Sequence, residues 1–496
     1  MIELKYIDVK KEKLKVLIIP VCEDKDIFED DIISPLIAKA KEIKEFKGKK
    51  DEELIFYGYP GINAERIIFK GIGENDKIST EVLRSFAGGV VKKNIKNKFS
   101  EVYIEVPTQN LTKIQKDELL ESLMEGAYLG NYIFDGYKQK KDNDKIPLKK
   151  ICFIANIDTI AQYAYLPDKI KTICDGTFLA RNWVNIPSNL KKPEQFTQSI
   201  IDIAEKENIK ATVFSGKILE QKGFGGIVAV ASGSVCEPSM VILEYMPEKA
   251  KKTIALIGKG VTFDSGGISL KSQSGLEDMK IDMAGAAASA AAIFTASKLK
   301  LNANVISIIP IVENMPSGTA TRPGDVIKSY DGKTVEILNT DAEGRLILMD
   351  AMSYAVQIYK PDILIDIATL TGSCMAALGT KIAGLFSLDD ELASKIIKAG
   401  ERTNELCWRL PLPDFYKDQL KSEIADIKNV SDDKYGGAIT AALFLLEFVG
   451  DTKWAHLDIA GPASTKKDES YYSFGGTGFG VRLFIKFIED FISEIS

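Results

Sequence analysis

Gly258-Lys-Gly-Val-Thr-Phe-Asp-Ser-Gly-Gly267 and Asn339-Thr-Asp-Ala-Glu-Gly-Arg-Leu346 are two glycine-rich runs that each carry acidic residues. Lys271 and Asp282 lie between them. Glycine has no Cβ, so the backbone in such runs can approach a bound ion or substrate closely. Carboxylates that converge in a fold repel one another, and hard divalent cations are the usual remedy. The two runs therefore indicate a two-metal hydrolase.

The chain contains a single histidine, His456, among its 496 residues. A zinc site built from two or three histidines is therefore impossible within one chain, and a Ser-His-Asp or Cys-His arrangement would depend wholly on His456. This residue lies in the alternating run 454–460, which is typical of a buried strand and favours a structural role. Any metal ion must consequently be held by carboxylates, backbone carbonyls or, unusually, an amine.

The overall composition is that of an ordinary soluble protein with room for two or three domains. Hydrophobic residues make up 45% and charged residues 27%, and the net charge of −6 gives no general attraction to nucleic acid or an anionic membrane. The six cysteines are scattered and form no Cys-x-x-Cys pair, and no apolar stretch typical of a signal peptide follows the N-terminus. These features favour a cytoplasmic protein with reduced thiols and no membrane association.

The hydrophobic pattern predicts an α/β fold with two domains. A smaller N-terminal α/β domain is expected over residues 1–165, followed by a connecting segment over residues 166–190. The apolar runs of the first domain predict strands at 15–21, 66–70, 102–106 and 150–155, and amphipathic spacing predicts helices at 80–97 and 113–137.

Residues 191–496 are expected to form the larger domain, an α/β catalytic domain with a central mixed sheet flanked by helices. Both glycine-rich runs follow apparent strands, and sites in open α/β sheets collect beyond the carboxyl ends of the strands. The two runs are therefore expected to meet there. The pattern predicts strands at 241–245, 253–257, 305–312 and 363–368, an alanine-rich helix at 283–299 and a second helix at 345–359.

The spacing of Asp341, Glu343 and Arg345 predicts a strand end or loop, with a helix beginning near residues 344–346. In extended backbone, residues at i, i+2 and i+4 share one face, whereas on a helix i and i+2 point to nearly opposite sides. A helix N-terminus decorated with acids is the simpler alternative, because the helix dipole favours carboxylates there. That alternative does not explain an arginine in the same cluster.

The other charged residues of this region have ordinary explanations when each is considered alone. Asp264 before a glycine pair would be a turn residue, Asp282 a helix N-cap, and Lys259 a surface lysine. Their combination with the second run argues against three separate coincidences and favours a functional site.

Five motifs resemble those of the cytosolic leucyl aminopeptidase family. The resemblance is highly specific and covers roughly residues 175–496, and it implies a smaller, variable N-terminal domain beside the catalytic domain. The N-terminal third matches only in length and α/β pattern. The motifs are Lys259-Gly-Val-Thr-Phe-Asp-Ser-Gly-Gly267, Lys271, Met279-Lys-Ile-Asp-Met283, Asn339-Thr-Asp-Ala-Glu-Gly-Arg-Leu346 and Ala368-Thr-Leu-Thr-Gly372, with further support from Asp458-Ile-Ala-Gly461 and Gly476-Thr-Gly-Phe-Gly-Val-Arg482.

The resemblance also implies cofactors and site residues. The cofactors would be two divalent metal ions per subunit, manganese or zinc with magnesium or cobalt as alternatives, and a bicarbonate ion. As a metal ligand, the lysine would have to be neutral. The implied metal ligands are Lys259, Asp264, Asp282, Asp341 and Glu343, the catalytic residues Lys271 and Arg345, and the residues of the apolar substrate pocket Met279, Thr369 and Gly372.

The implied activity is removal of the N-terminal residue, leucine or another apolar residue, from peptides with a free N-terminus. Two bridged cations would supply hydroxide from water, Lys271 would stabilise the oxyanion, and Arg345 would hold the bicarbonate that shuttles protons. The resemblance implies a homohexamer. The expected partners include no membrane and no nucleic acid.

Two other functions remain open at this point. A two-metal phosphohydrolase or nuclease needs the same acid clusters, but it predicts a basic phosphate-binding groove, and the C-terminal part is net negative. A protein that has lost catalysis and binds DNA would use the lysine clusters of residues 1–165. That region carries equal numbers of acidic and basic residues, which weakens this alternative.

Overall fold

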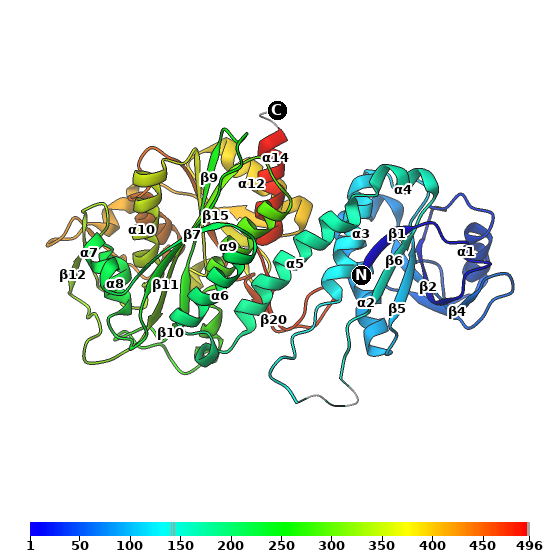
Figure 1. Cartoon of the computed structure of the whole chain (residues 1–496), viewed down its shortest axis with the longest axis horizontal. Coiled ribbons are helices and arrows are strands. Elements are labelled where there is room, and N and C mark those ends of the chain that lie inside the picture. The colour runs from blue at the N-terminus through cyan, green and yellow to red at the C-terminus, as the bar shows by residue number, and fades with distance from the viewer. Residues whose placement is uncertain (140, 142–143, 494–496) are drawn as a thin grey trace. The chain divides into compact units, whose positions relative to one another are not determined.

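The computed structural model describes residues 1–139, 141 and 144–493 (Figure 1). The chain divides into two compact units, one of residues 1–174 and 467–474 and the other of residues 175–466 and 475–496. The division falls inside a continuous helix, α5 (Leu166–Asn185), which occupies most of the predicted connecting segment. The domain boundaries expected at 165 and 190 remain predictions. None of the described helices is both long and apolar enough to cross a membrane.

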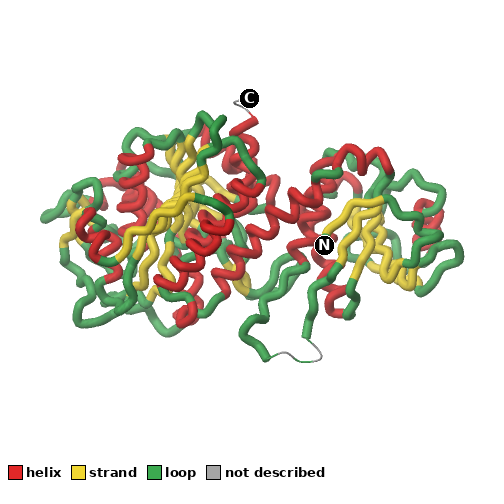
Figure 2. The backbone as a smooth tube through the Cα atoms, in the orientation of Figure 1, coloured by secondary structure: helices red, strands yellow, loops and turns green. Residues whose placement is uncertain are grey.

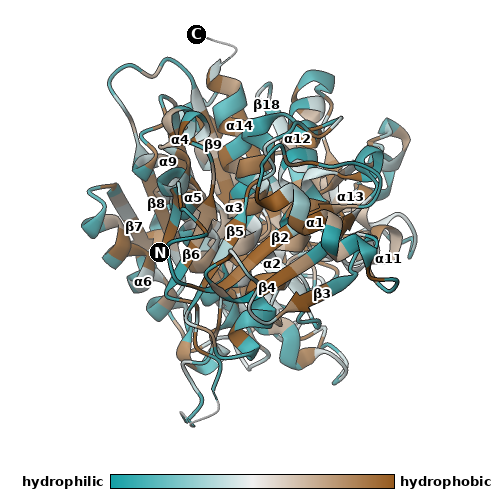
Figure 3. Ribbon diagram, turned by 90° about the vertical axis from the view of Figure 1, so that its right-hand side faces the viewer, coloured by the Kyte–Doolittle hydropathy of each residue, from teal (hydrophilic) through white to brown (hydrophobic). Residues whose placement is uncertain are grey.

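The N-terminal unit is built on a six-stranded sheet of order β1-β6-β5-β2-β4-β3. Its neighbouring strands are parallel except for β3, which is antiparallel to β4. Strands β2 and β4 consist mostly of apolar residues (Figure 3), as expected for parallel strands that are covered on both faces. The elements are β1 (Ile2–Lys5), β2 (Leu14–Cys22), α1 (Ile33–Glu42), β3 (Glu53–Phe56), β4 (Ala64–Gly73), α2 (Thr80–Lys96), β5 (Glu101–Glu105), α3 (Lys116–Gly130), β6 (Lys150–Ile154) and α4 (Ile157–Tyr163).

The four strands and two helices predicted for this unit are present as β2, β4, β5, β6, α2 and α3. Helix α3 is shorter than the predicted range 113–137 because the chain turns away after Gly130. The side-chain amide of Asn131 then binds a distant segment: its Oδ1 accepts from the Leu148 N–H at 2.7 Å and its Nδ2 donates to the Leu148 carbonyl at 3.0 Å. Amphipathic spacing alone does not show such a turn.

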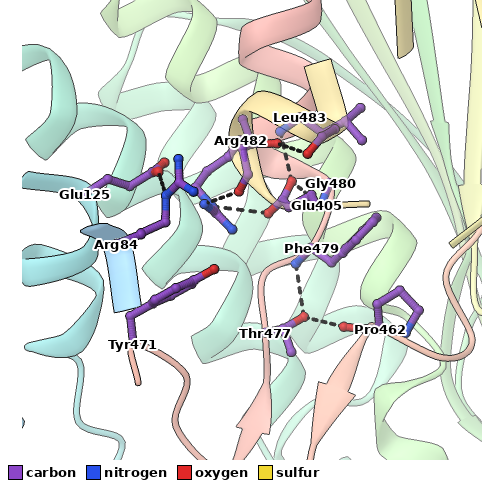
Figure 4. Close-up of polar contacts among 12 residues, drawn as sticks. Arg84, Glu125, Glu405, Pro462, Tyr471, Thr477, Phe479, Gly480, Arg482 and Leu483 are labelled. Carbon is purple, nitrogen blue, oxygen red and sulfur yellow. Dashed lines mark hydrogen bonds and ion pairs between the residues drawn. The ribbon is translucent and has the colours of Figure 1, made fainter. Parts of the chain in front are cut away.

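Helices α2 and α3 cross closely because glycines lie at the contact. A Cβ on Gly126 would lie 2.1 Å from the carbonyl oxygen of Arg84, so a side chain there would force the helices apart. The same residue, Arg84, forms a buried ion pair with Glu125 (Figure 4). Close backbone contact and a paired charge therefore fix this helix pair.

The C-terminal unit contains a nine-stranded mixed sheet with helices on both faces (Figure 2), as predicted. Its path runs β16-β15-β18-β14-β9-β11-β8-β7, and β10 pairs in parallel with β11. The central strands β18, β14, β9 and β11 are parallel, and β8 and β7 add an antiparallel edge. The strands are β7 (Lys210–Ser215), β8 (Ser239–Tyr245), β9 (Thr253–Gly258), β10 (Gly260–Asp264), β11 (Asn304–Asn314), β14 (Ile363–Ala368), β15 (Ala383–Phe386), β16 (Cys407–Arg409) and β18 (Lys453–Asp458).

The predicted strands of this unit correspond to β8, β9, β11 and β14, and the predicted helices to α9 and α10. Helix α10 ends at Tyr354 and continues as one π-helical stretch, Ala355–Tyr359. A smaller sheet of order β12-β13-β17 lies outside the main one. The remaining elements are α6 (Pro193–Lys206), α7 (Lys217–Lys222), α8 (Gly225–Ala231), α9 (Ala284–Lys298), β12 (Val326–Lys328), β13 (Thr334–Glu336), α10 (Gly344–Tyr354), α11 (Gly372–Leu378), α12 (Asp390–Thr403), β17 (Ile427–Lys428), α13 (Gly437–Leu446), β19 (Ser464–Thr465), β20 (Gly475–Gly476) and α14 (Val481–Ser493).

Helix α9 lies unusually close to the central strands, and this contact shapes the site. A Cβ on Gly285 would lie 2.0 Å from the Ile367 carbonyl oxygen, and one on Gly258 would lie 2.6 Å from the Ala286 Cα. The sequence of α9 permits this approach, because residues 284–292 are glycine, alanine and serine and are buried. The helix thereby brings its N-terminal end, just after Asp282, beside Lys259 at the end of β9.

Candidate metal centre

Lys259 lies between β9 and β10 and connects three parts of the sequence. Its Nζ lies 2.8 Å from Asp282 Oδ1 and 2.8 Å from Glu343 Oε1. It also donates a hydrogen bond of 3.0 Å to the Thr369 carbonyl oxygen. The side chain is only 3% exposed, so its ammonium group is held among these acceptors and away from solvent.

Lys271 makes a second set of ion pairs beside the first. Its Nζ lies 2.8 Å from Asp264 Oδ2, at the end of β10, and 2.5 Å from Asp341 Oδ1, in the loop before α10. The other oxygen of Asp264 accepts hydrogen bonds from the Gly266 N–H at 2.9 Å and from Asn314 Nδ2 at 2.8 Å. The two glycine-rich runs thus meet at one place, as predicted, although the second run follows β13 of the smaller sheet and not a strand of the main sheet.

Carboxylate oxygens of Asp264, Asp341 and Glu343 all lie within 4.8 Å of one another. Asp282 Oδ2 is buried and accepts no hydrogen bond from any described residue, whereas the buried Asp341 Oδ1 and Glu343 Oε1 have ion pairs with Lys271 and Lys259 as their polar contacts. Buried polar atoms without hydrogen bonds are costly and uncommon in folded proteins. Oxygen ligands gathered in this way fit a divalent cation, so these residues could hold one.

The charges of the cluster are unequal, with four carboxylates and only two ammonium groups. Burial, followed by repulsion from Glu343, raises the pKa of Asp264, and burial raises the pKa of Asp282 well above its usual range. A raised carboxyl pKa means that the ionised form is disfavoured there. Divalent cations would relieve this excess of negative charge.

Both lysines carry their proton among these carboxylates. Burial alone would lower the pKa of Lys259, but the charges of Asp282 and Glu343 outweigh it and raise the pKa above the usual value. The same balance raises the pKa of Lys271. A neutral Lys259 therefore requires that added positive charge displace its proton.

Arg345 lies in the first turn of α10 and is nearly buried. Its Nη1 donates to the Asn429 carbonyl oxygen at 2.7 Å, whereas its Nε is buried and donates to no described group. Within the described chain, no carboxylate forms an ion pair with this guanidinium. Burial lowers its pKa to about 10, which still leaves it charged at neutral pH. Such a buried cation is suited to bind an anion.

The three residues of the implied substrate pocket differ in how they relate to the carboxylate cluster. Thr369 touches the cluster directly, because its hydroxyl donates to Asp282 Oδ1 at 2.7 Å. Met279 lies in the 3₁₀ helix before Asp282, and its carbonyl accepts from the Asp282 N–H at 3.3 Å. Gly372 begins α11, and a Cβ there would meet open space. Thr369 and Met279 thus both bind Asp282, and Gly372 lies three residues after Thr369 in the sequence.

The backbone of the second run is a turn and not a strand. Thr340 and Asp341 lie in a turn, and Glu343 has helical φ and ψ of −78° and −35°. The loop alternative is therefore right, the extended one is wrong, and α10 begins at Gly344 as predicted. Asp341 and Glu343 still converge, whereas Arg345 binds a separate group.

His456 takes no part in this cluster. It is fully buried in β18, where its Nδ1 lies 2.5 Å from Asp366 Oδ1. The other oxygen of Asp366 accepts from Trp454 Nε1 at 2.7 Å. The alternating run around His456 predicted this buried strand and a structural role.

Sequence reasoning assigned no role to two residues that support the site, Asn314 and Asp458, although Asp458 begins one of the quoted motifs. Asn314 donates from Nδ2 to Asp264 and, at 3.0 Å, to the Thr340 carbonyl. Asp458 accepts from the Leu370 N–H at 3.1 Å and from the Thr371 hydroxyl at 2.7 Å. For Asn314 the available signal was its position at the end of a central strand, and for Asp458 it was both such a position and the motif Asp458-Ile-Ala-Gly461.

The comparisons with known proteins agree with this geometry. Residues 178–485 match the catalytic domain of the cytosol aminopeptidase family, and residues 22–141 match its N-terminal domain. The second match corrects the view that the N-terminal third resembles the family only in length and pattern.

Curated proteins and solved structures give the same result over nearly the whole chain. "Probable cytosol aminopeptidase" of Chlorobium limicola is 40% identical over 97% of this chain and 98% of its own, and that of Syntrophotalea carbinolica is 41% identical over 93% of each. The structure of the bottromycin maturation enzyme BotP has a TM-score of 0.84 at 31% identity, covering 97% of this chain and 100% of its own. BotP in complex with Mn also has a TM-score of 0.84, at 32% identity over 96% and 99%. The chain therefore belongs to the cytosol aminopeptidase family of metallo-exopeptidases.

Proposed function

We propose that this protein removes the N-terminal residue, leucine or another apolar residue, from peptides by means of two divalent metal ions. The observation that supports the proposal most strongly is the buried group of carboxylates whose negative charge exceeds that of its two lysines. Manganese or zinc, with magnesium or cobalt as alternatives, fits this mixed set of ligands. The proposed ligands are Lys259, Asp264, Asp282, Asp341 and Glu343.

Bound divalent ions would lower the pKa of a water molecule and polarise the scissile carbonyl. The chain's own contribution begins with Lys271, whose ammonium group lies at the partly exposed edge of the cluster. A positive charge fixed there would stabilise an oxyanion that develops on the substrate. Its ion pairs with Asp264 and Asp341 hold the ammonium group in place before substrate binds.

Arg345 supplies a second, separate positive charge. Its burial and the free hydrogen-bonding capacity at Nε support a bound anion, for which we propose bicarbonate. Bicarbonate bound there would supply a proton acceptor, which the cluster otherwise lacks because its carboxylates are proposed ligands. The single histidine cannot take this role, because it is buried against Asp366.

Specificity for the first residue would come from the pocket lined by Met279, Thr369 and Gly372 and from recognition of a free α-amine. The open space at Gly372 supports room for an apolar side chain. The family resemblance supports a homohexamer in the cytoplasm. With a net charge of −6, we expect no nucleic-acid partner. No observation favours phosphoryl transfer, whose basic groove the sequence does not provide.

A pair of matched peptides tests the proposal. A peptide with a free N-terminus should lose its first residue in the presence of manganese, and the same peptide acetylated at that nitrogen should not react. Acetylation removes the basic lone pair and adds bulk but leaves the scissile bond unchanged. The apparent affinity for the free peptide should improve as pH rises toward the α-amino pKa of about 8. Equal cleavage of both peptides, or any internal cut, would contradict an aminopeptidase.

A further inference from the structure

Asn429 is a fully buried residue that no charged motif of the sequence singles out. It directly follows β17, which pairs in parallel with β13. Its backbone N–H donates to the Glu336 carbonyl at 2.9 Å, which extends the ladder by one bond. Beyond this point β13 ends, and the chain enters the loop that carries Asp341.

The side chain of Asn429 continues the same pattern into the loop. Its Oδ1 accepts from the Leu338 N–H at 2.9 Å and from the Asn339 N–H at 3.4 Å. Its Nδ2 donates to the Asn339 carbonyl at 2.7 Å and to the Ala342 carbonyl at 3.5 Å. A primary amide offers two acceptor sites and two donors, and here all four are used. The side chain thus replaces the next peptide group of a strand.

Two further contacts connect Asn429 to two parts of the candidate site. Asn429 binds both the N–H and the carbonyl of Asn339. The side-chain Oδ1 of Asn339 in turn accepts a hydrogen bond of 2.8 Å from the Asp341 N–H. The backbone carbonyl of Asn429 accepts from Arg345 Nη1 at 2.7 Å. Thus one residue contacts both the loop of a proposed metal ligand and the guanidinium proposed to bind the anion.

We propose that Asn429 is a positioning residue that sets the carboxylate of Asp341 and the guanidinium of Arg345 relative to each other. It touches neither substrate nor metal and acts through Asn339 and its own carbonyl. The amide is needed because the site faces it with two N–H donors and two carbonyl acceptors. Aspartate has the same shape but no donor, so it would repel the carbonyls of Asn339 and Ala342. This inference rests on the proposed function.

The test compares Asn429→Asp and Asn429→Ala with a control, Asn131→Asp. Asn131 also uses its amide to bind both backbone groups of one distant residue, Leu148, but it lies in the N-terminal unit. Manganese binding to the metal-free proteins is measured by titration calorimetry, and kcat and KM are measured on the metal-loaded proteins. Both Asn429 variants should bind manganese about 10- to 100-fold more weakly and lose kcat by a similar factor, with KM little changed. The control should match wild type in both respects.

The outcomes separate this inference from the one on which it rests. If wild type binds no manganese, the proposed metal site fails. If wild type binds it and folded Asn429→Ala binds it equally well with normal kcat, Asn429 has no positioning role. Failure of both Asn429 variants to fold would also overturn the inference, because a role in folding would then account for the hydrogen bonds.

Discussion

The C-terminal sheet holds two buried groups of ionisable side chains, and they differ in how completely they are paired. In the middle of β14 and β18, Asp366 uses both of its oxygens, one toward His456 and one toward Trp454. At the ends of the strands, the cluster around Lys259 holds four carboxylates and two lysines, and Asp282 Oδ2 accepts no hydrogen bond from any part of the chain that is described. Asp366 and His456 are fully buried, whereas Lys271 and Asp341 of the cluster are partly exposed, and the cluster has more acidic than basic side chains.

The difference shows how burial can serve either stability or binding. A buried acid with a complete set of partners stabilises the fold, and removing one partner leaves the others unsatisfied. A surplus of buried acids destabilises the protein until a cation binds, so such a surplus marks a functional site. The comparison therefore predicts opposite effects of mutation in the two groups.

The largest effect is expected for Asp341→Asn. The isosteric amide supplies no charge to a divalent ion, and losing about 4 kcal/mol of electrostatic stabilisation lowers kcat by roughly 1,000-fold. Removing one acid also relieves repulsion in the cluster, so the metal-free variant should unfold at the same temperature as wild type or higher. Peptidase assays and thermal unfolding in EDTA measure both quantities. A variant with a tenth of wild-type kcat and normal metal content would show that Asp341 is not a ligand.

Asp366→Ala should have the reverse effect. It leaves His456 and Trp454 buried without their acceptor, and breaking a buried pair costs about 3–5 kcal/mol. The activity of the folded fraction should stay close to wild type, because neither Asp366 nor His456 is among the proposed metal ligands or catalytic residues. Urea unfolding measures the stability, and kcat at low temperature measures the activity of the folded protein. Normal stability with lost activity would mean that the paired group takes part in catalysis after all.

The sequence predicts the carboxylate cluster well because its chemistry is concentrated in two short runs. Lys259 and Asp264 share one run, Asp341 and Glu343 the other, and the strand before the first is apolar enough to recognise. The fold then brings the runs together from two sheets, since the first run follows β9 of the main sheet and the second follows β13 of the smaller sheet. The local geometry is less predictable. The second run is a turn because the Asp341 N–H donates to the Asn339 side chain and the Asn339 carbonyl accepts from the Asn429 side chain.

The supporting residues could not be predicted in the same way. Asn429 lies 90 positions from Asn339 in the sequence, and nothing in its own surroundings shows that its amide completes a strand. The short strands β12, β13 and β17 could not be predicted either, because two or three residues are too few to show a hydrophobic periodicity. Helix α3 ends early for a related reason, since the bonds of Asn131 are to Leu148. Long-range polar contacts, unlike apolar patterns, leave little trace in sequence.

The smallest predicted effect concerns the pH dependence of the paired group. Burial alone would lower the pKa of His456, but the charge of Asp366 outweighs it and raises the pKa above 6.5. The folded state therefore holds a proton that the unfolded state releases above that pH. The resulting stability is fully present below about pH 6.5 and is lost as pH rises through the folded pKa, with a slope of at most about 1.4 kcal/mol per pH unit.

A histidine-free variant, His456→Gln, isolates this contribution from the other titrating groups. Urea unfolding between pH 6 and 9 should show that the stability of wild type falls more steeply than that of the variant. Because the chain has one histidine, a single Hε1 resonance in the NMR spectrum reports its protonation directly. That resonance should titrate above pH 6.5 in wild type. A resonance that titrates at or below 6.5 would mean that burial outweighs Asp366, so that the Asp366–His456 group holds an uncompensated charge as the carboxylate cluster does.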